Sequence, residues 1–169
     1  MKTRLAALDG VLAHVLTDLH DAGIQLQGIL PRLWAMAQQQ VLAETLREFL
    51  HESTRQAVMV SGMIETLGES APERPWQGMR ATIAETEQLL AGVEGGNLST
   101  TDLLLISSCL RIKALKIAAY STARSLAEKG RHTAMAQLLE DILAQEMQGE
   151  LALMEFAHGT LFTLGMAHL

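Results

Sequence analysis

The sequence has little of several features that would define a class of protein. It contains one cysteine, Cys109, which excludes an internal disulfide, and aromatic residues make up only 4% of its 169 residues. A core poor in aromatics and rich in Leu, Ala, Ile, Val and Met favours helices over a β-sandwich. Lysine is also rare, since the chain has only Lys2, Lys113, Lys116 and Lys129. Two of these four stand close together in an apolar stretch.

The charge balance and the hydropathy exclude two classes of partner. Acidic side chains number 19 against 13 basic ones, the formal net charge is −6, and the chain has no Lys/Arg cluster. We therefore expect no binding to nucleic acid or to an anionic membrane through charge. No uncharged apolar run approaches the roughly 20 residues that span a bilayer. The sequence predicts a cytoplasmic protein, and its lone cysteine suits a reducing compartment.

Apolar residues recur with a helical period along the chain. Breakers divide it into five predicted helices, at about residues 3–29, 33–67, 76–92, 99–129 and 132–158. The fourth begins at a start signal, residues 99–102, that ends in Asp102. The link that holds the short third helix has about thirty residues, enough to cross a bundle from end to end. The sequence predicts one all-α domain over 1–169, an antiparallel four-helix bundle of ferritin-like topology.

Two lysines stand where the fourth helix should bury apolar side chains. Its apolar stripe passes through Ile106, Lys113 and Tyr120, with Lys116 alongside. The stripes of the other long helices pass through small or acidic residues at comparable depth: Gly23, Ser53, Ala57, Glu146 and Gly149. Small residues on three helices thus leave room for long side chains on the fourth.

Five segments resemble, in order and spacing, the family typified by the bacterial stress proteins YciE and YciF. They are LTDLHDAGIQL (16–26), FLHESTRQAV (49–58), WQGMRATIAETEQLL (76–90), LLISSCLRIKALKIAAYSTARSLAEKG (104–130) and LLEDILAQEM (138–147). The fourth is the most specific, through IAAY at 117–120 and AEKG at 127–130. The resemblance covers about residues 5–157 and leaves 158–169 as a C-terminal extension. It implies a ferritin-like bundle, a homodimer and a carboxylate-rich dimetal centre.

Most metal-binding acids of that family are missing here. The family positions form a former metal-site layer, which consists of Gly23, Ser53, Ala57, Glu85, Lys113, Lys116, Gln145 and Glu146. Only Glu85 and Glu146 keep a family acid, whereas two acids of the fourth segment have become Lys113 and Lys116. A dimetal centre needs about four carboxylates and two further ligands. We therefore expect the dimetal site to be lost and no cofactor to be bound.

A core ion pair is the expected replacement. We predict that Lys113, with Lys116, reaches across the former metal cavity to Glu146 or Glu85, because a buried carboxylate needs a counter-charge. Alternatively, a lysine at the edge of the stripe extends its ammonium group to water. We expect three other acidic side chains, Asp18, Asp21 and Glu52, to be solvated.

The sequence leaves several functions open. The first is a non-catalytic structural, interaction or stress-associated module. The second is a weakened iron or manganese site of His20, Glu85 and Glu146 with oxidase or peroxidase chemistry. The third is a small anionic ligand held in the emptied cavity by Lys113 or Lys116. Cys109 is expected to be a small buried apolar residue. In a homodimer, apolar residues near the C-terminus would pack on the partner: Phe156, Leu161, Phe162, Leu164 and Met166.

Overall fold

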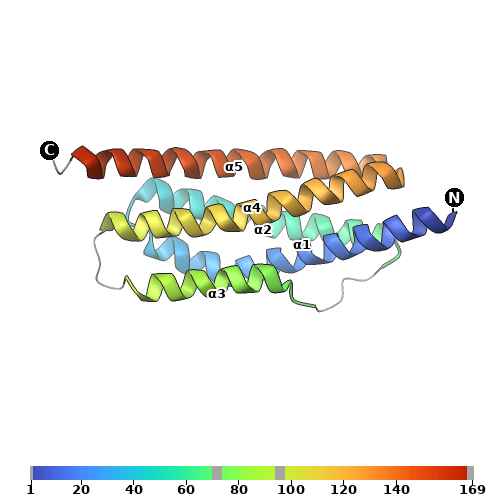
Figure 1. Cartoon of the computed structure of the whole chain (residues 1–169), viewed down its shortest axis with the longest axis horizontal. Coiled ribbons are helices and arrows are strands. Elements are labelled where there is room, and N and C mark those ends of the chain that lie inside the picture. Colours follow the sequence, from blue (N-terminus) through green and yellow to red (C-terminus); the bar gives the residue numbers. More distant parts are fainter. Residues whose placement is uncertain (1, 70–73, 94–97, 167–169) are drawn as a thin grey trace.

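Five α-helices form the part of the chain that the structure, a computed structural model, describes: residues 2–69, 74–93 and 98–166, with side chains for 7–69, 74–93 and 100–159. They are α1 (Lys2–Met36), α2 (Gln40–Thr66), α3 (Gln77–Ala91), α4 (Leu98–Gly130) and α5 (Thr133–Met166). No strand occurs in those residues. The four long helices lie along one another, and the short α3 packs on α4 and α1 (Figure 1). The predicted all-α four-helix bundle is confirmed.

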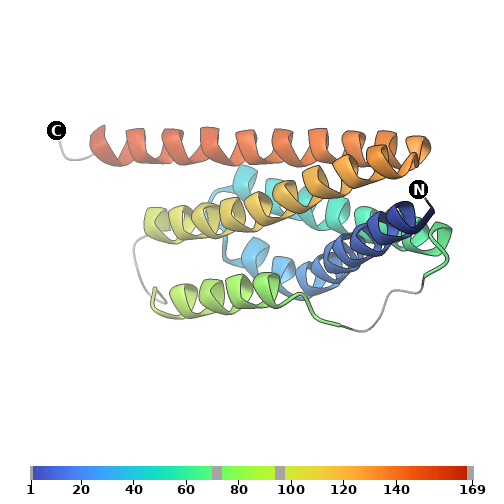
Figure 2. The same cartoon turned by 45° about the vertical axis from the view of Figure 1, so that its right-hand side comes forward.

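The chain crosses the length of the bundle between α2 and α4 (Figures 1 and 2). The pairs α1/α2 and α4/α5 are both antiparallel, and α1 joins the two pairs by packing on α4. The chain leaves α2 at the end where α1 begins and returns along α3 to the opposite end, where α4 begins. This crossover, with its short helix, is the predicted ferritin-like topology.

The first helix is longer than predicted because Pro31 does not end it. A proline inside a helix removes one backbone hydrogen bond and costs about 3 kcal/mol. The neighbouring Leu30 and Leu33 are fully buried, and each buried leucine contributes about 1.5–3 kcal/mol. Packing therefore offsets the cost of Pro31. As a result α2 begins at Gln40, not near residue 33. Separately, α5 runs beyond its predicted end, to Met166.

The connection between α1 and α2 is held by a side chain of α4. The buried Asp102 accepts hydrogen bonds from the backbone N–H of Gln38 (2.8 Å) and of Gln39 (3.1 Å). The sequence placed Asp102 in the start signal of its own helix, but α4 begins at Leu98, so Asp102 lies in its second turn. The carboxylate of Asp102 thus supplies a hydrogen-bond acceptor for two backbone amides that precede the first turn of α2. The side chain of Ser99, another part of that signal, lies outside the described residues.

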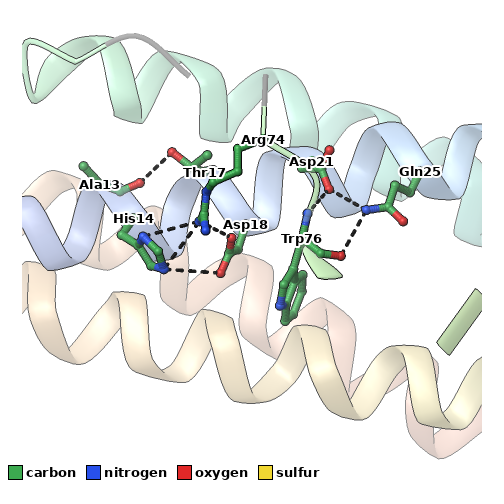
Figure 3. Close-up of polar contacts among 8 residues, drawn as sticks. All are labelled: Ala13, His14, Thr17, Asp18, Asp21, Gln25, Arg74 and Trp76. Atoms are coloured by element: carbon green, nitrogen blue, oxygen red, sulfur yellow. Dashed lines mark hydrogen bonds and ion pairs between the residues drawn. The ribbon is translucent and has the colours of Figure 1, made fainter. Parts of the chain in front are cut away.

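Polar contacts fix the part of the crossover that leads into α3 against α1 (Figure 3). Arg74 Nη2 lies 2.7 Å from Asp18 Oδ1. The backbone N–H of Trp76 donates to Asp21 Oδ2 at 2.6 Å, and Gln25 Nε2 donates to the carbonyl oxygen of Trp76 at 3.3 Å. Both aspartates are half-buried, so the expectation that they are solvated is wrong.

The apolar core is divided into two clusters along the bundle. One includes Leu46 and Ile112, and the other includes Val60 and Tyr120. On α4, the residues between these clusters include Lys113 and Lys116, and on α5 the same interval holds Glu146. The bundle therefore contains a polar layer between two apolar halves.

Candidate functional site: a buried ion cluster

Glu146 lies at the centre of the polar layer and contacts both lysines of α4. Lys116 Nζ is 2.7 Å from Glu146 Oε1, and Lys113 Nζ is 3.2 Å from Glu146 Oε2. Glu146 is 0% exposed and each lysine is 1% exposed. The structure thus brings together the three charged residues that the stripe pattern singled out. Neither ammonium group extends to water.

The ammonium group of Lys116 has three acceptors, as many as it has hydrogens. Besides Glu146 it donates to Gln56 Oε1 at 2.8 Å and to Ser53 Oγ at 3.2 Å, both on α2. Gln56 in turn donates through Nε2 to Gln145 Oε1 at 3.2 Å. Ser53 and Gln145, two positions that the family resemblance assigned to a metal-site layer, therefore belong to the network, and Gln56 links α2, α4 and α5.

Lys113 is held by charge and by an aromatic ring. Its Nζ lies 4.0 Å from the ring centroid of Phe49, a distance at which a cation is attracted to the face of the ring. The same Nζ lies 3.7 Å from Glu52 Oε2. On the α5 side, a Cβ atom at Gly149 would lie 2.8 Å from Nζ. The absence of a side chain at Gly149 is what admits the ammonium group.

Glu52 is the member of the site that the sequence reasoning missed. Its side chain is 15% exposed, so the expectation that it is solvated is wrong. With Glu52 and Glu146 the cluster has two carboxylates against two ammonium groups, and its formal charges balance. The helical spacing could have placed Glu52 in the site, because it stands one turn after Phe49 and one turn before Gln56, on the same face of α2.

Burial and ion pairing shift the pKa values in this cluster. Burial lowers the pKa of Lys116 to about 8, and the Glu146 carboxylate opposes that shift. For Glu146, burial alone would raise the pKa, but Lys116 and Lys113 together hold it below the ordinary value of a glutamate. Burial raises the pKa of Glu52, against the influence of Lys113. Because the pKa of Glu146 is lowered whereas that of Glu52 is raised, Glu146 is the carboxylate that the lysines stabilise more.

Gly23 and Ala57, two small residues that the family resemblance assigned to the metal-site layer, lie in contact between α1 and α2. A Cβ atom at Gly23 would lie 2.7 Å from Ala57 Cβ and 3.2 Å from the backbone oxygen of Ser53. Gly23 therefore allows α1 to approach α2 closely. This contact differs from the one at Gly149, where the absent side chain leaves room for a lysine.

Glu85 does not join the cluster, which corrects the prediction that it shares the lysines with Glu146. It is exposed on α3, where Arg111 Nη1 lies 2.9 Å from Glu85 Oε1. α3 packs outside the four long helices, so its outward face cannot supply a core acid. The half-buried His20 lines an open groove between α1 and α2. The alternative metal set of His20, Glu85 and Glu146 is therefore not assembled.

The residues of the cluster do not fit a dimetal centre. Such a centre needs about four carboxylates and two further ligands. The cluster offers Glu146 and Glu52, and both are already close to ammonium groups. Across the described residues, no three His, Cys, Asp or Glu side chains are grouped as a metal site would require.

Cys109 lies in the apolar core next to this layer. It is fully buried, and burial raises the pKa of its thiol to about 12. The thiolate, which is the reactive form, is therefore scarce at neutral pH. This position agrees with the predicted role as a small buried residue.

Comparison with known proteins identifies the family. Residues 7–162 match the family described as a domain of unknown function (DUF892), and the chain belongs to it. This agrees with the resemblance to the YciE/YciF-type family. No curated protein matches the chain.

Solved structures share the fold. The Escherichia coli stress protein YciF matches with a TM-score of 0.85 at 22% identity, over 91% of this chain and 96% of its own. YcfI, described as a putative structural protein of Rhodopseudomonas palustris, matches with a TM-score of 0.81 at 20% identity, over 86% and 92%. A protein from Xanthomonas campestris matches with a TM-score of 0.72 at 17% identity, over 96% and 99%. No helix in the described part of this chain is long and apolar enough to cross a membrane.

Proposed function

We propose that this protein is a non-catalytic, ferritin-like structural or interaction module in which two lysines replace the cations of a dimetal centre. The observation that carries the proposal is the contact of Lys113 and Lys116 with the fully buried Glu146. The likeness to a stress protein and to a putative structural protein supports a stress-associated or structural role. The lysines and Cys109 are buried, so no nucleophile of this layer faces solvent.

The physical reason is charge compensation. A buried carboxylate without a counter-charge costs several kcal/mol, and removing one partner of a buried pair typically costs about 3–5 kcal/mol. A metal ion can supply that positive charge only when the cell provides it. Lysines on α4 supply it within the chain, so this bundle can fold without metal.

The test is to replace the two buried lysines with glutamates. Lys113→Glu with Lys116→Glu would place two further carboxylates beside Glu52 and Glu146. We expect the variant to unfold at a lower temperature than wild type, and its midpoint to rise when Mn²⁺ or Fe²⁺ is added under anaerobic conditions. The wild-type midpoint should not change, and wild-type protein grown with iron and manganese should contain no stoichiometric metal by elemental analysis.

A matched control carries the same charge change on the surface. Lys129→Glu with Arg131→Glu alters two exposed residues at the end of α4 and should show no metal-dependent midpoint. The proposal fails if wild type holds a stoichiometric transition metal. That result would favour a weakened iron or manganese oxidoreductase.

The third candidate, binding of a small anion in the core, has less support. Lys113 and Lys116 already face Glu146 and Glu52, so the cluster has no surplus positive charge to attract an anion. Stabilisation of the wild-type protein, but not of Lys113→Met, by acidic metabolites in a thermal-shift screen would revive it.

The proposal places the protein in the cytoplasm as a homodimer that does not bind nucleic acid or membranes. Its single cysteine and its net charge of −6 support the compartment and the excluded partners. Exposed Ile24 and Val58 beside the α1/α2 groove are apolar surface that self-association would cover. Of the residues predicted to contact the partner, Phe156 is partly buried against the apolar core, and the side chains of Leu161, Phe162, Leu164 and Met166 lie outside the described residues. Light scattering tests the dimer, and a monomer would contradict it.

A further inference from the structure

The outer face of α5 carries a row of residues with the spacing of a helix-packing seam. Ala144, Met147, Leu151, Met154 and His158 follow one another at intervals of three and four residues, and all are exposed. The exposed fractions of the three large apolar side chains are 53% for Met147, 58% for Leu151 and 41% for Met154. Alternating steps of three and four place side chains on one stripe that packs against another helix. We call these five residues the α5 seam.

The seam lies on a helix with charge of one sign. α5 has five acidic residues and no Lys or Arg: Glu140, Asp141, Glu146, Glu150 and Glu155. Glu146 belongs to the core cluster, and Glu140 pairs with Arg124 of α4. The other three flank the seam, Asp141 and Glu155 on one side and Glu150 on the other. No salt bridge among the described residues includes any of these three, and Asp141 accepts a hydrogen bond from Gln137 Nε2 at 3.2 Å.

We propose that the α5 seam docks a basic amphipathic helix of another protein. Apolar residues of that helix would cover Met147, Leu151 and Met154, and its flanking Lys or Arg residues would pair with the three acids. Methionine side chains are flexible and adapt to different apolar partners, and a helix on an apolar stripe is a common mode of recognition. Complementary charges beside the stripe set the choice of partner.

A second copy of α5 is a poorer occupant. It would bring more carboxylates to the seam and no Lys or Arg to meet them. The proposal is also independent of the core cluster, since the seam residues are exposed whereas Lys113, Lys116 and Glu146 are buried. A metal-binding result that overturned the proposed function would leave this one standing.

Peptide binding to the full-length protein tests the proposal. The probe is a fluorescein-labelled helix of about 20 residues, long enough to be helical in complex, with Leu on its apolar face and Lys beside it. We expect micromolar binding by fluorescence anisotropy, and at least tenfold weaker binding after Leu151→Asp. Leu151→Asp adds a negative charge, which by itself should favour a basic peptide. Weaker binding would therefore report the loss of apolar contact. Raising NaCl should weaken binding by wild type, since exposed ion pairs are screened.

Two controls make the result specific. Val58→Asp alters another exposed apolar residue, on α2, and should leave binding unchanged. A peptide with Glu in place of every Lys should not bind wild type. Circular dichroism should show Leu151→Asp folded, since its side chain projects into solvent. Equal binding to the Leu151→Asp and Val58→Asp variants, or binding of the acidic peptide, would overturn the proposal. Conversion of a dimer to a monomer by Leu151→Asp would also overturn it, because the seam would then belong to a second copy.

Discussion

Gly149 of α5 faces the ammonium group of Lys113 of α4 so closely that a Cβ atom would lie 2.8 Å from Nζ and 3.1 Å from Cε. A lysine in a packed core needs volume as well as counter-charge, and Gly149 provides the volume while Glu146, one turn earlier on α5, provides the charge. The two requirements are met by neighbouring positions of one helix. Charge and shape are therefore coupled in this layer.

Replacement of Gly149 by alanine tests this coupling. Glycine inside a helix is ordinarily less favourable than alanine by about 1 kcal/mol, so the substitution would be stabilising if space were free. Here the new methyl group forces Lys113 from its place, and we expect a loss of about 1–3 kcal/mol in the free energy of unfolding, as for other overpacked cores. Urea denaturation measures it.

Gly28 and Gly62 are the matched controls for that change. Both lie inside long helices, and a Cβ atom at either meets nothing within 4 Å. Alanine at these positions should be neutral or stabilising. Introducing Gly149→Ala into a Lys113→Leu background should remove the penalty, since leucine is shorter. An equal cost in both backgrounds would contradict the coupling.

Glu146→Gln should be strongly destabilising. It leaves two buried ammonium groups without their shared carboxylate, and a loss of about 3–5 kcal/mol is expected. Glu155→Gln, an exposed change on the same helix, should alter stability by less than about 0.5 kcal/mol. A small effect of Glu146→Gln in urea denaturation would mean that the lysines can reach water.

Removing three of the four charges, those of Lys113, Lys116 and Glu146, should be far less harmful, because the remaining carboxylate, Glu52, is 15% exposed and can reach water. The triple variant Lys113→Met, Lys116→Met and Glu146→Leu replaces the ions with apolar groups of similar size. Such replacements are commonly neutral or stabilising by about 1–4 kcal/mol. We expect the triple variant to unfold at or above the wild-type urea midpoint. A midpoint as low as that of Glu146→Gln would show that the cluster supplies more than charge balance.

The pH dependence of stability should reveal Lys116. Its pKa is about 8 in the folded protein and 10.5 in the ordinary case, so between these values the unfolded state binds more protons. The free energy of unfolding then rises with pH in this window, by up to about 3 kcal/mol at about 1.4 kcal/mol per pKa unit. Wild type should therefore gain stability relative to Lys116→Met from pH 7 to pH 10. A difference that stays flat, or falls, would mean that Lys116 is not desolvated.

Asp102→Ala should loosen the connection between α1 and α2. The substitution removes the carboxylate that accepts from the amides of Gln38 and Gln39, and loss of a hydrogen bond to a charged group costs about 1.5–3 kcal/mol. Asp141→Ala, at an exposed position of α5, is the control. Amide hydrogen exchange should accelerate at residues 38 and 39 in Asp102→Ala alone. Unchanged exchange there would contradict the capping role.

Several features of the site were visible in the sequence because periodicity reports which side of a helix faces inward. The stripe of α4 placed Lys113 and Lys116 near the core, and that of α5 did the same for Glu146. Periodicity failed for Glu52, since a half-buried acid beside a stripe looks like a solvated one. The prediction put Glu85 in the core cluster because it relied on the match of one segment to a family. Such a match does not tell which face of α3 is turned toward the bundle.

The sequence by itself determined the helices, their amphipathic faces and the crossover topology, because these depend on local periodicity and on breakers such as Gly68 and Gly130. Only the tertiary structure decided which charges meet. Pro31 lies inside α1 because its neighbours Leu30 and Leu33 are buried in the core. Asp102 binds the amides that precede α2 although it lies 63–64 residues further along the chain. Lys113 and Lys116 share Glu146, and not Glu85, because α5 is packed against α4 at that level. Such contacts depend on how the helices pack against one another, and the periodicity within a single helix carries no information about that packing.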